Sequence, residues 1–104
     1  MIMQKNHDLF LALMGRSTRG KLLGYFLAQG TRPRFIAQAA HAVQVDPAGA
    51  QRELRWLEAI GLLASTSTGY RKYYRLQDRS PLVTPLRQLY VAARHAKARP
   101  PARR

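Results

Sequence analysis

The stretch from Asp46 to Leu76 changes its hydrophobic period at Gly61, and this change limits the folds open to the chain. Before Gly61 the apolar residues recur at helical spacing, and after it the sequence is typical of paired strands. Asp46-Pro47 is a strong helix start, because Asp caps free N–H groups and a proline in the first position loses no hydrogen bond. The segment therefore predicts a helix over about 46–60 followed directly by a β-hairpin.

The predicted helix has one apolar stripe, formed by Ala50, Leu54, Leu57 and Ile60. The hairpin has a first strand over 62–67, a turn over 68–70 and a returning strand over 71–76. Side chains alternate between the two faces of a strand, so Tyr73 and Tyr74 point in opposite directions. We expect Tyr74 to lie in the core.

Further elements are expected on both sides of this segment. Ser17 is a plausible N-cap and Gly30 a plausible C-cap for a helix between them. Thr84 and Pro85 form a similar start for the last helix. The expected elements are a helix ending in Leu9–Met14, a helix over Thr18–Gln29, a short strand at Phe35-Ile36, a small helix over 37–43 and a final helix over about 84–96.

A chain of 104 residues is the size of one compact domain. We expect an N-terminal helical extension over 1–15, the domain proper over 16–96, and a disordered basic tail over 97–104. The fold class is mainly α with a small β-hairpin, which makes it α+β.

The charge of the chain points to its partner. Eighteen Lys and Arg against five Asp and Glu give a formal net charge of +13. Such a domain attracts polyanions, and double-stranded DNA is the expected partner. Arg outnumbers Lys fourteen to four, which suits phosphate and guanine recognition, although a GC-rich genome produces the same bias.

Several function classes find no support in the sequence. The chain has no Cys, so a thiol nucleophile, a disulfide scaffold and a cysteine-based sensor are excluded. No apolar run is long enough to span a membrane, and Leu9–Met14 is too short for a secretory signal. His7, His41 and His95 lack ligand spacing, and no catalytic set is present. We therefore expect no enzyme activity, no cofactor and no metal, and a location in the cytoplasm on the nucleoid.

The helix and hairpin together resemble a known family. The residues from Val45 to Leu63 are similar to the recognition helix and first wing strand of winged helix-turn-helix regulators of the arsenical-resistance repressor (ArsR) and MarR type, and Gly69–Leu76 is similar to their wing. Leu13–Arg19 loosely resembles the start of the nucleotidyltransferase-associated winged helices. The resemblance covers roughly residues 9–95 and implies a transcriptional regulator, in particular a repressor. The cysteine pair of the metal-sensing members is missing, so that mechanism does not carry over.

In this reading the helix over 46–60 enters the major groove. Gln51 is a candidate for adenine, Arg52 for guanine and Arg55 for a phosphate. In the wing, Arg71 is a candidate for the minor groove. The expected DNA-binding residues are Arg34, Pro47, Ala48, Gln51, Arg52, Arg55, Tyr70, Arg71 and Lys72.

Other interpretations of the same residues remain open. The helix arginines are alternatively solvated or paired with Glu53 and Glu58. Near the helix starts, Arg16, Arg19, Arg32 and Arg34 are either phosphate contacts or plain surface charges. The protein is alternatively an architectural or plasmid- or phage-type protein that coats DNA, or a protein-interaction module. For the regulator we expect a homodimer, with dimer contacts from Leu9, Phe10, Leu13, Leu86, Leu89, Tyr90 and Ala93.

Overall fold

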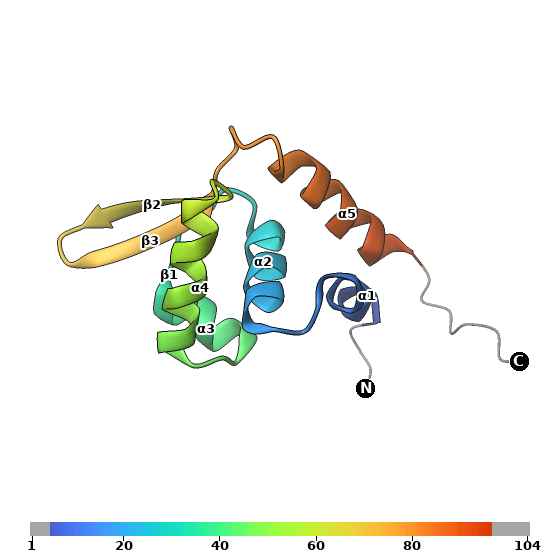
Figure 1. The fold of residues 1–104 in the computed structure, drawn as a ribbon, viewed down its shortest axis with the longest axis horizontal. Helices are drawn as coiled ribbons and strands as arrows, with labels where there is room; N and C mark the ends of the chain where they lie inside the picture. The colour runs from blue at the N-terminus through green and yellow to red at the C-terminus, as the bar shows by residue number, and fades with distance from the viewer. Residues whose placement is uncertain (1–4, 97–104) are drawn as a thin grey trace, which may run out of the picture.

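The computed structural model describes residues 5–96 and shows five helices and a three-stranded antiparallel sheet in this range. The predicted disordered tail over 97–104 lies outside the described residues. Figure 1 shows α2 in the middle, with α4 and the β2–β3 hairpin on one side and α1 and α5 on the other. In chain order the elements are α1 (Lys5–Met14), α2 (Thr18–Gln29), β1 (Arg34–Phe35), α3 (Ile36–Val43), α4 (Pro47–Ala59), β2 (Leu63–Thr68), β3 (Arg71–Leu76) and α5 (Val83–His95).

Helices α2 and α4 begin with the same kind of cap. The Ser17 hydroxyl accepts a hydrogen bond from the Gly20 N–H at 3.1 Å, and the Asp46 carboxylate accepts one from the Gly49 N–H at 3.1 Å. Each cap satisfies one of the N–H groups that a helix start leaves unpaired. Both caps are therefore confirmed, and α2 has the bounds that the sequence predicts.

The turn between α3 and α4 depends on Gln44, which has a φ of 59° and lies in the left-handed region. Its N–H and that of Val45 close the end of α3 by hydrogen bonds to carbonyls of that helix. Asp46 then caps α4, so few residues separate the two helices. The structure thus has the helix–tight turn–helix arrangement that the sequence predicts.

The strands pair in the order β1-β3-β2. Tyr74 is opposite Ser65 on one side and Arg34 on the other, and it is fully buried, as predicted. Tyr73 is on the opposite face, where its ring lies 4.5 Å from that of Phe35. The first strand was expected at Phe35-Ile36, but Ile36 already belongs to α3.

The reason for this shift is a side-chain contact. The Phe35 N–H donates to the Gln38 amide oxygen at 2.9 Å, which starts the helix one residue earlier.

The prediction that Ile60 belongs to the buried stripe of α4 was also wrong, because it is 43% exposed. Ile60 is the C-cap of α4, and the chain then turns at Gly61 with a φ of +88°, so the helical stripe ends at Leu57.

The start of α5 differs from the expected Thr84 cap. The N–H groups of Leu82 and Val83 donate to the side chain and the backbone of Ser80, both at 3.2 Å, and the helix begins at Val83. Val83 is 1% exposed, so burial of its side chain favours this earlier start. Pro85 still lies in the first turn, where its missing N–H costs nothing.

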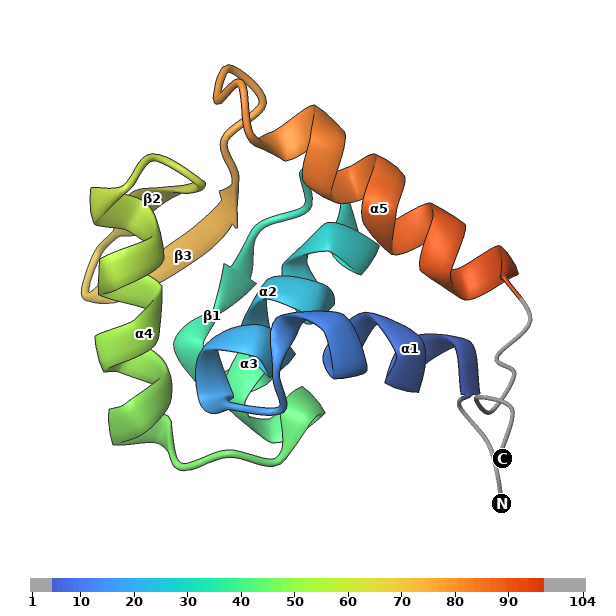
Figure 2. The same cartoon turned by 45° about the vertical axis from the view of Figure 1, so that its right-hand side comes forward.

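Helix α1 packs against α5 within the same chain (Figure 2). The rings of Phe10 and Tyr90 meet at an interplanar angle of 77°, and Phe10, Tyr90 and Ala93 are at most 5% exposed. These three residues were expected at a dimer contact, and that assignment is wrong in this structure, because they form part of the core of one protomer. The sequence did not reveal that α1 covers this face of α5.

The remaining candidates for a dimer contact are more accessible. Leu9, Leu86 and Leu89 are half-buried and pack against the core, whereas Leu13 is 61% exposed. The core itself joins all five helices to β2 and β3. Its largest fully buried side chains are Tyr74, Phe10, Phe26, Leu22, Leu54, Leu57, Leu63, Leu76 and Val83.

Candidate nucleic-acid interface

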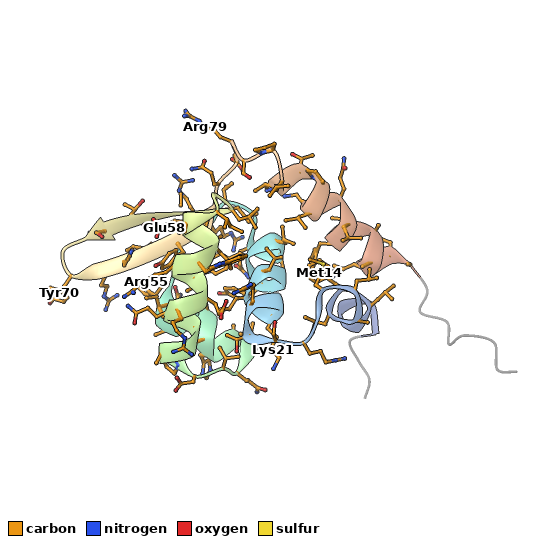
Figure 3. The ribbon with its side chains drawn as sticks, viewed as in Figure 1. Met14, Lys21, Arg55, Glu58, Tyr70 and Arg79 are labelled. Atoms are coloured by element: carbon orange, nitrogen blue, oxygen red, sulfur yellow. The ribbon has the colours of Figure 1, made fainter. Side chains whose placement is uncertain are left out.

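The outward face of α4 is polar, small and basic. Ala50, Leu54 and Leu57 are buried, so the residues on the other side of the helix face solvent. The exposed residues there include Pro47, Ala48, Gln51, Arg52 and Arg55, and Trp56 and Ala59 on the same helix are exposed as well. Figure 3 shows Arg55 on this helix, beside the hairpin. The structure therefore brings together the five residues that the sequence analysis assigned to this helix.

The carboxylates of α4 are directed to its two flanks. Glu53 Oε1 lies 2.7 Å from the Nε of Arg19 on α2. Glu58 accepts a hydrogen bond from the Ser65 hydroxyl at 2.6 Å and lies 3.8 Å from the Nζ of Lys72. All three partners are outside α4, and neither carboxylate pairs with Arg52 or Arg55.

The other two carboxylates with described side chains also have partners. Asp46 caps α4, and Asp78 lies 3.8 Å from Arg87. Within the described part of the chain, Arg52 and Arg55 form no ion pair. The alternative that they are neutralised by glutamates of their own helix is therefore wrong, and their positive charge stays available on the exposed face.

The hairpin places its basic residues on two different faces. Tyr70 lies at the tip and is fully exposed (Figure 3). Lys72 shares the face of Tyr74 and points toward α4, where it meets Glu58. Arg71 shares the face of Tyr73, and its guanidinium carbon lies 4.5 Å from the centre of the Phe35 ring. Lys72 is therefore adjacent to the α4 face, and Arg71 lies on the reverse side of the hairpin.

Arg34 is placed differently from the other candidates. It is half-buried, and its Nε and Nη2 donate to the Gln29 amide oxygen at 3.0 and 2.7 Å. These bonds hold the side chain against the end of α2 and use part of its donor capacity. Of the nine expected contact residues, Arg34 is the one whose side chain is held by hydrogen bonds to another side chain.

Sequence reasoning did not connect Arg19 with Trp56. The guanidinium carbon of Arg19 lies 3.6 Å from the centre of the Trp56 ring, in addition to its bond to Glu53. Trp56 remains 42% exposed on α4. A helical spacing of three residues puts Glu53 and Trp56 on one side of α4, but their partner is on another helix and could not be found from spacing.

Neither a metal site nor a membrane-spanning helix is found among the described residues. They contain no group of three His, Cys, Asp or Glu side chains that could hold a metal ion. None of the helices in this range is long and apolar enough to cross a membrane. His41 and His95 are both exposed.

Two helices joined by a tight turn, followed by a β-hairpin beside the second helix, define the winged helix-turn-helix fold. The sequence matches no family model, and no characterised protein matches it significantly in sequence. Solved structures do match this fold.

Three of these structures illustrate the likeness. The transcriptional regulator HlyU from Vibrio vulnificus CMCP6 is 19% identical, with 83% of this chain and 84% of that chain covered and a TM-score of 0.61. The antimony-specific transcriptional repressor AntR is 21% identical, with 83% and 75% covered and a TM-score of 0.56. The homodimeric winged helix-turn-helix DNA-binding domain Mb0332 from Mycobacterium bovis is 25% identical, with 93% and 94% covered and a TM-score of 0.57.

Proposed function

We propose that the protein is a transcriptional regulator that binds double-stranded DNA sequence-specifically, as a homodimer, and acts as a repressor. Helix α4 enters the major groove, and the β2–β3 hairpin lies on the flanking backbone or minor groove. The observation that carries this proposal is the outward face of α4, where Arg52 and Arg55 have no ion pair among the described residues. The formal charge of +13 agrees with a polyanionic partner.

Each residue of this face has a distinct role in the proposal. Gln51 binds an adenine edge and Arg52 a guanine edge, since these side chains form bidentate bonds to those bases. Arg55 is closer to the hairpin and binds a phosphate. Pro47 and Ala48 have short side chains at the start of the helix, which allow close approach to the groove. Tyr70 and Lys72 contact the backbone beside it.

The structural neighbours support the regulatory role. One is named as an antimony-specific repressor and another as a homodimeric DNA-binding domain. For this chain, the dimer contact uses Leu13 and the half-buried Leu9, Leu86 and Leu89, because Phe10, Tyr90 and Ala93 are buried within the protomer. The two half-sites of the operator then lie about one DNA turn, roughly 34–36 Å, apart.

Selection of binding sites from a random duplex library tests the proposal. Wild-type protein should enrich a pseudo-palindromic sequence. The double variant Gln51→Ala/Arg52→Ala should lose about 1–3 kcal/mol per lost base contact on that sequence, while binding to random DNA falls less. Arg79→Ala is the matched control, because Arg79 projects from the loop before α5, away from the face of α4 (Figure 3).

The outcomes separate the candidate functions. Tight binding without an enriched sequence identifies an architectural protein that coats DNA. Failure to bind any duplex at low salt contradicts DNA binding altogether and favours a protein-interaction module. A monomer at micromolar concentration in sedimentation analysis contradicts only the homodimer and leaves the proposal of DNA binding intact.

A further inference from the structure

The contact between α2 and α4 contains an arginine that is held in a fixed position at the surface. Arg19 Nε donates to Glu53 Oε1 at 2.7 Å, and the guanidinium plane lies over Trp56, 3.6 Å from the ring centre. The Arg19 side chain is still 44% exposed. A carboxylate and an aromatic ring thus fix a long side chain that normally moves freely in solvent.

This cluster is not needed to hold the two helices together. Helices α2 and α4 already share a core in which Leu22, Phe26, Leu54 and Leu57 are at most 1% exposed. An exposed ion pair adds little to such packing. Trp56, a large apolar side chain, stays largely outside this core and instead lies against Arg19.

The free part of Arg19 suits a phosphate. Its Nε is used by Glu53, whereas the two terminal nitrogens have no hydrogen-bond partner among the side chains described, those of residues 9–96. These nitrogens form the planar fork that binds phosphate oxygens. Because Trp56 and Glu53 already fix the side chain, little rotamer freedom remains to be lost on binding.

The position of Arg19 complements that of the hairpin. Along α4, Glu58 is directed to the flank where Lys72 lies, and Glu53 is directed to the flank where Arg19 lies. The exposed residues Gln51, Arg52 and Arg55 lie between these two flanks. A major groove about 12 Å wide is bordered by a phosphate strand on each side, so a helix in that groove has phosphates along both flanks.

We propose that Arg19 binds a DNA phosphate on the flank of α4 away from the hairpin, and that Trp56 and Glu53 are its positioning residues. This inference rests on the proposed function, because it needs α4 to lie in the major groove. It assigns to α2 a direct part in the interface and gives the exposed Trp56 a role.

The test measures how the affinity of a fluorescein-labelled random-sequence duplex depends on salt. Each phosphate contact contributes a slope of about −0.9 to log K against log salt, which is about 3.5-fold in affinity between 50 and 200 mM salt. Arg19→Ala should therefore make the slope shallower by about 0.9 per protomer, so that the loss of affinity between 50 and 200 mM salt is about 3.5-fold smaller. Arg79→Ala removes the same charge elsewhere and should leave the slope close to that of wild type.

Two further variants separate positioning from folding. Arg19→Lys keeps the charge but loses the planar fork, so it should retain most of the slope with weaker affinity. Trp56→Leu should weaken binding about two- to ten-fold, the effect of freeing one side chain, but should have no additional effect in the Arg19→Ala background. Thermal melts of all variants identify any that fail to fold. If Arg19→Ala is one of them, Arg19→Lys is compared with wild type in its place.

Trp56 is the single tryptophan, so its fluorescence reports directly on this cluster. Addition of duplex should change its emission in wild type and much less in Arg19→Ala. A wild-type slope in folded Arg19→Ala, with unchanged emission on adding DNA, overturns the role of Arg19 and leaves DNA binding intact. If wild type binds no duplex, the proposed function fails as well.

Discussion

Phe10 and Tyr90 meet edge to face with ring centroids 5.2 Å apart, although they come from opposite ends of the domain. This contact joins α1 to α5 and makes the N-terminal helix part of the core. Phe10 also lies against Gly24 of α2, where an added Cβ would be 3.3 Å from its ring. Phe10 thus connects the three helices α1, α2 and α5.

Replacement of Phe10 should therefore destabilise the whole domain. Phe10→Ala leaves a cavity between α1, α2 and α5, and we expect a loss of about 3–5 kcal/mol in the free energy of unfolding. Urea denaturation at fixed protein concentration measures it. Val91→Ala on α5 is the control, since Val91 is 46% exposed, and it should change the free energy of unfolding by less than about 0.5 kcal/mol. Equal effects of the two variants would contradict the internal role of Phe10.

Tyr74→Phe should raise stability or leave it unchanged. The Tyr74 hydroxyl is buried and has no hydrogen-bond partner among the described residues. An unsatisfied buried hydroxyl costs about 1–3 kcal/mol, so its removal should stabilise the domain by about 1 kcal/mol. Tyr73→Phe on the opposite, half-buried face is the control and should have little effect. A clear loss of stability in Tyr74→Phe, measured by thermal unfolding, would show that the hydroxyl is satisfied.

Gly20 and Gly49 occupy equivalent positions, since each donates its N–H to the cap of its helix. A Cβ on Gly20 would collide with the carbonyl oxygen of Gly15, and this backbone atom cannot easily move away. We expect Gly20→Ala to destabilise the domain by about 1–3 kcal/mol.

The matched change at Gly49 should have the opposite sign. A Cβ there would meet only the flexible end of Arg52, at 3.7 Å. Gly49→Ala should stabilise the domain by about 0.4–1 kcal/mol, because it restricts the unfolded chain. Chemical denaturation of both variants measures the difference, and the same sign for both would contradict the packing at Gly20.

The cap of α4 can be tested at Asp46. Asp46→Ala removes the acceptor for the Gly49 N–H and should cost about 0.5–2 kcal/mol. Asp46→Asn keeps an acceptor oxygen and should retain most of that stability. Amide hydrogen exchange at Gly49 should be faster in the alanine variant alone, and fast exchange in both variants would mean that the charge, rather than the hydrogen bond, protects this end of α4.

The sequence predicts those elements whose signals are local. The bounds of α2 follow from Ser17 and Gly30, the start of α4 follows from Asp46-Pro47, and β3 follows from its pattern of residues. Each of these signals acts over a few residues, so no knowledge of the tertiary fold is needed. Tyr74 was found in the same way, from alternation along one strand.

Features that depend on distant packing could not be predicted in this way. From the sequence alone, Phe10 and Tyr90 were assigned to a dimer contact, because the packing of α1 on α5 cannot be predicted from local signals. The start of α5 moves to Val83 because Ser80 holds the preceding turn and Val83 is buried. The cluster at Arg19 joins α2 to α4 through side chains that no periodicity relates. In the candidate site, residue types and helical positions could be predicted, but the partners of the charged groups could not.

The left-handed conformation of Gln44 has a consequence for association with a partner. A residue with a side chain at a φ of 59° costs about 1 kcal/mol more than glycine, and in return it has fewer alternative conformations. The two hydrogen bonds that close α3 at this turn, and the Asp46 cap that follows, hold the joint between α3 and α4, so we expect the angle of α4 to be set when the domain folds. The encounter of α4 with its target should then resemble rigid-body docking, in which little entropy remains to be lost at the joint.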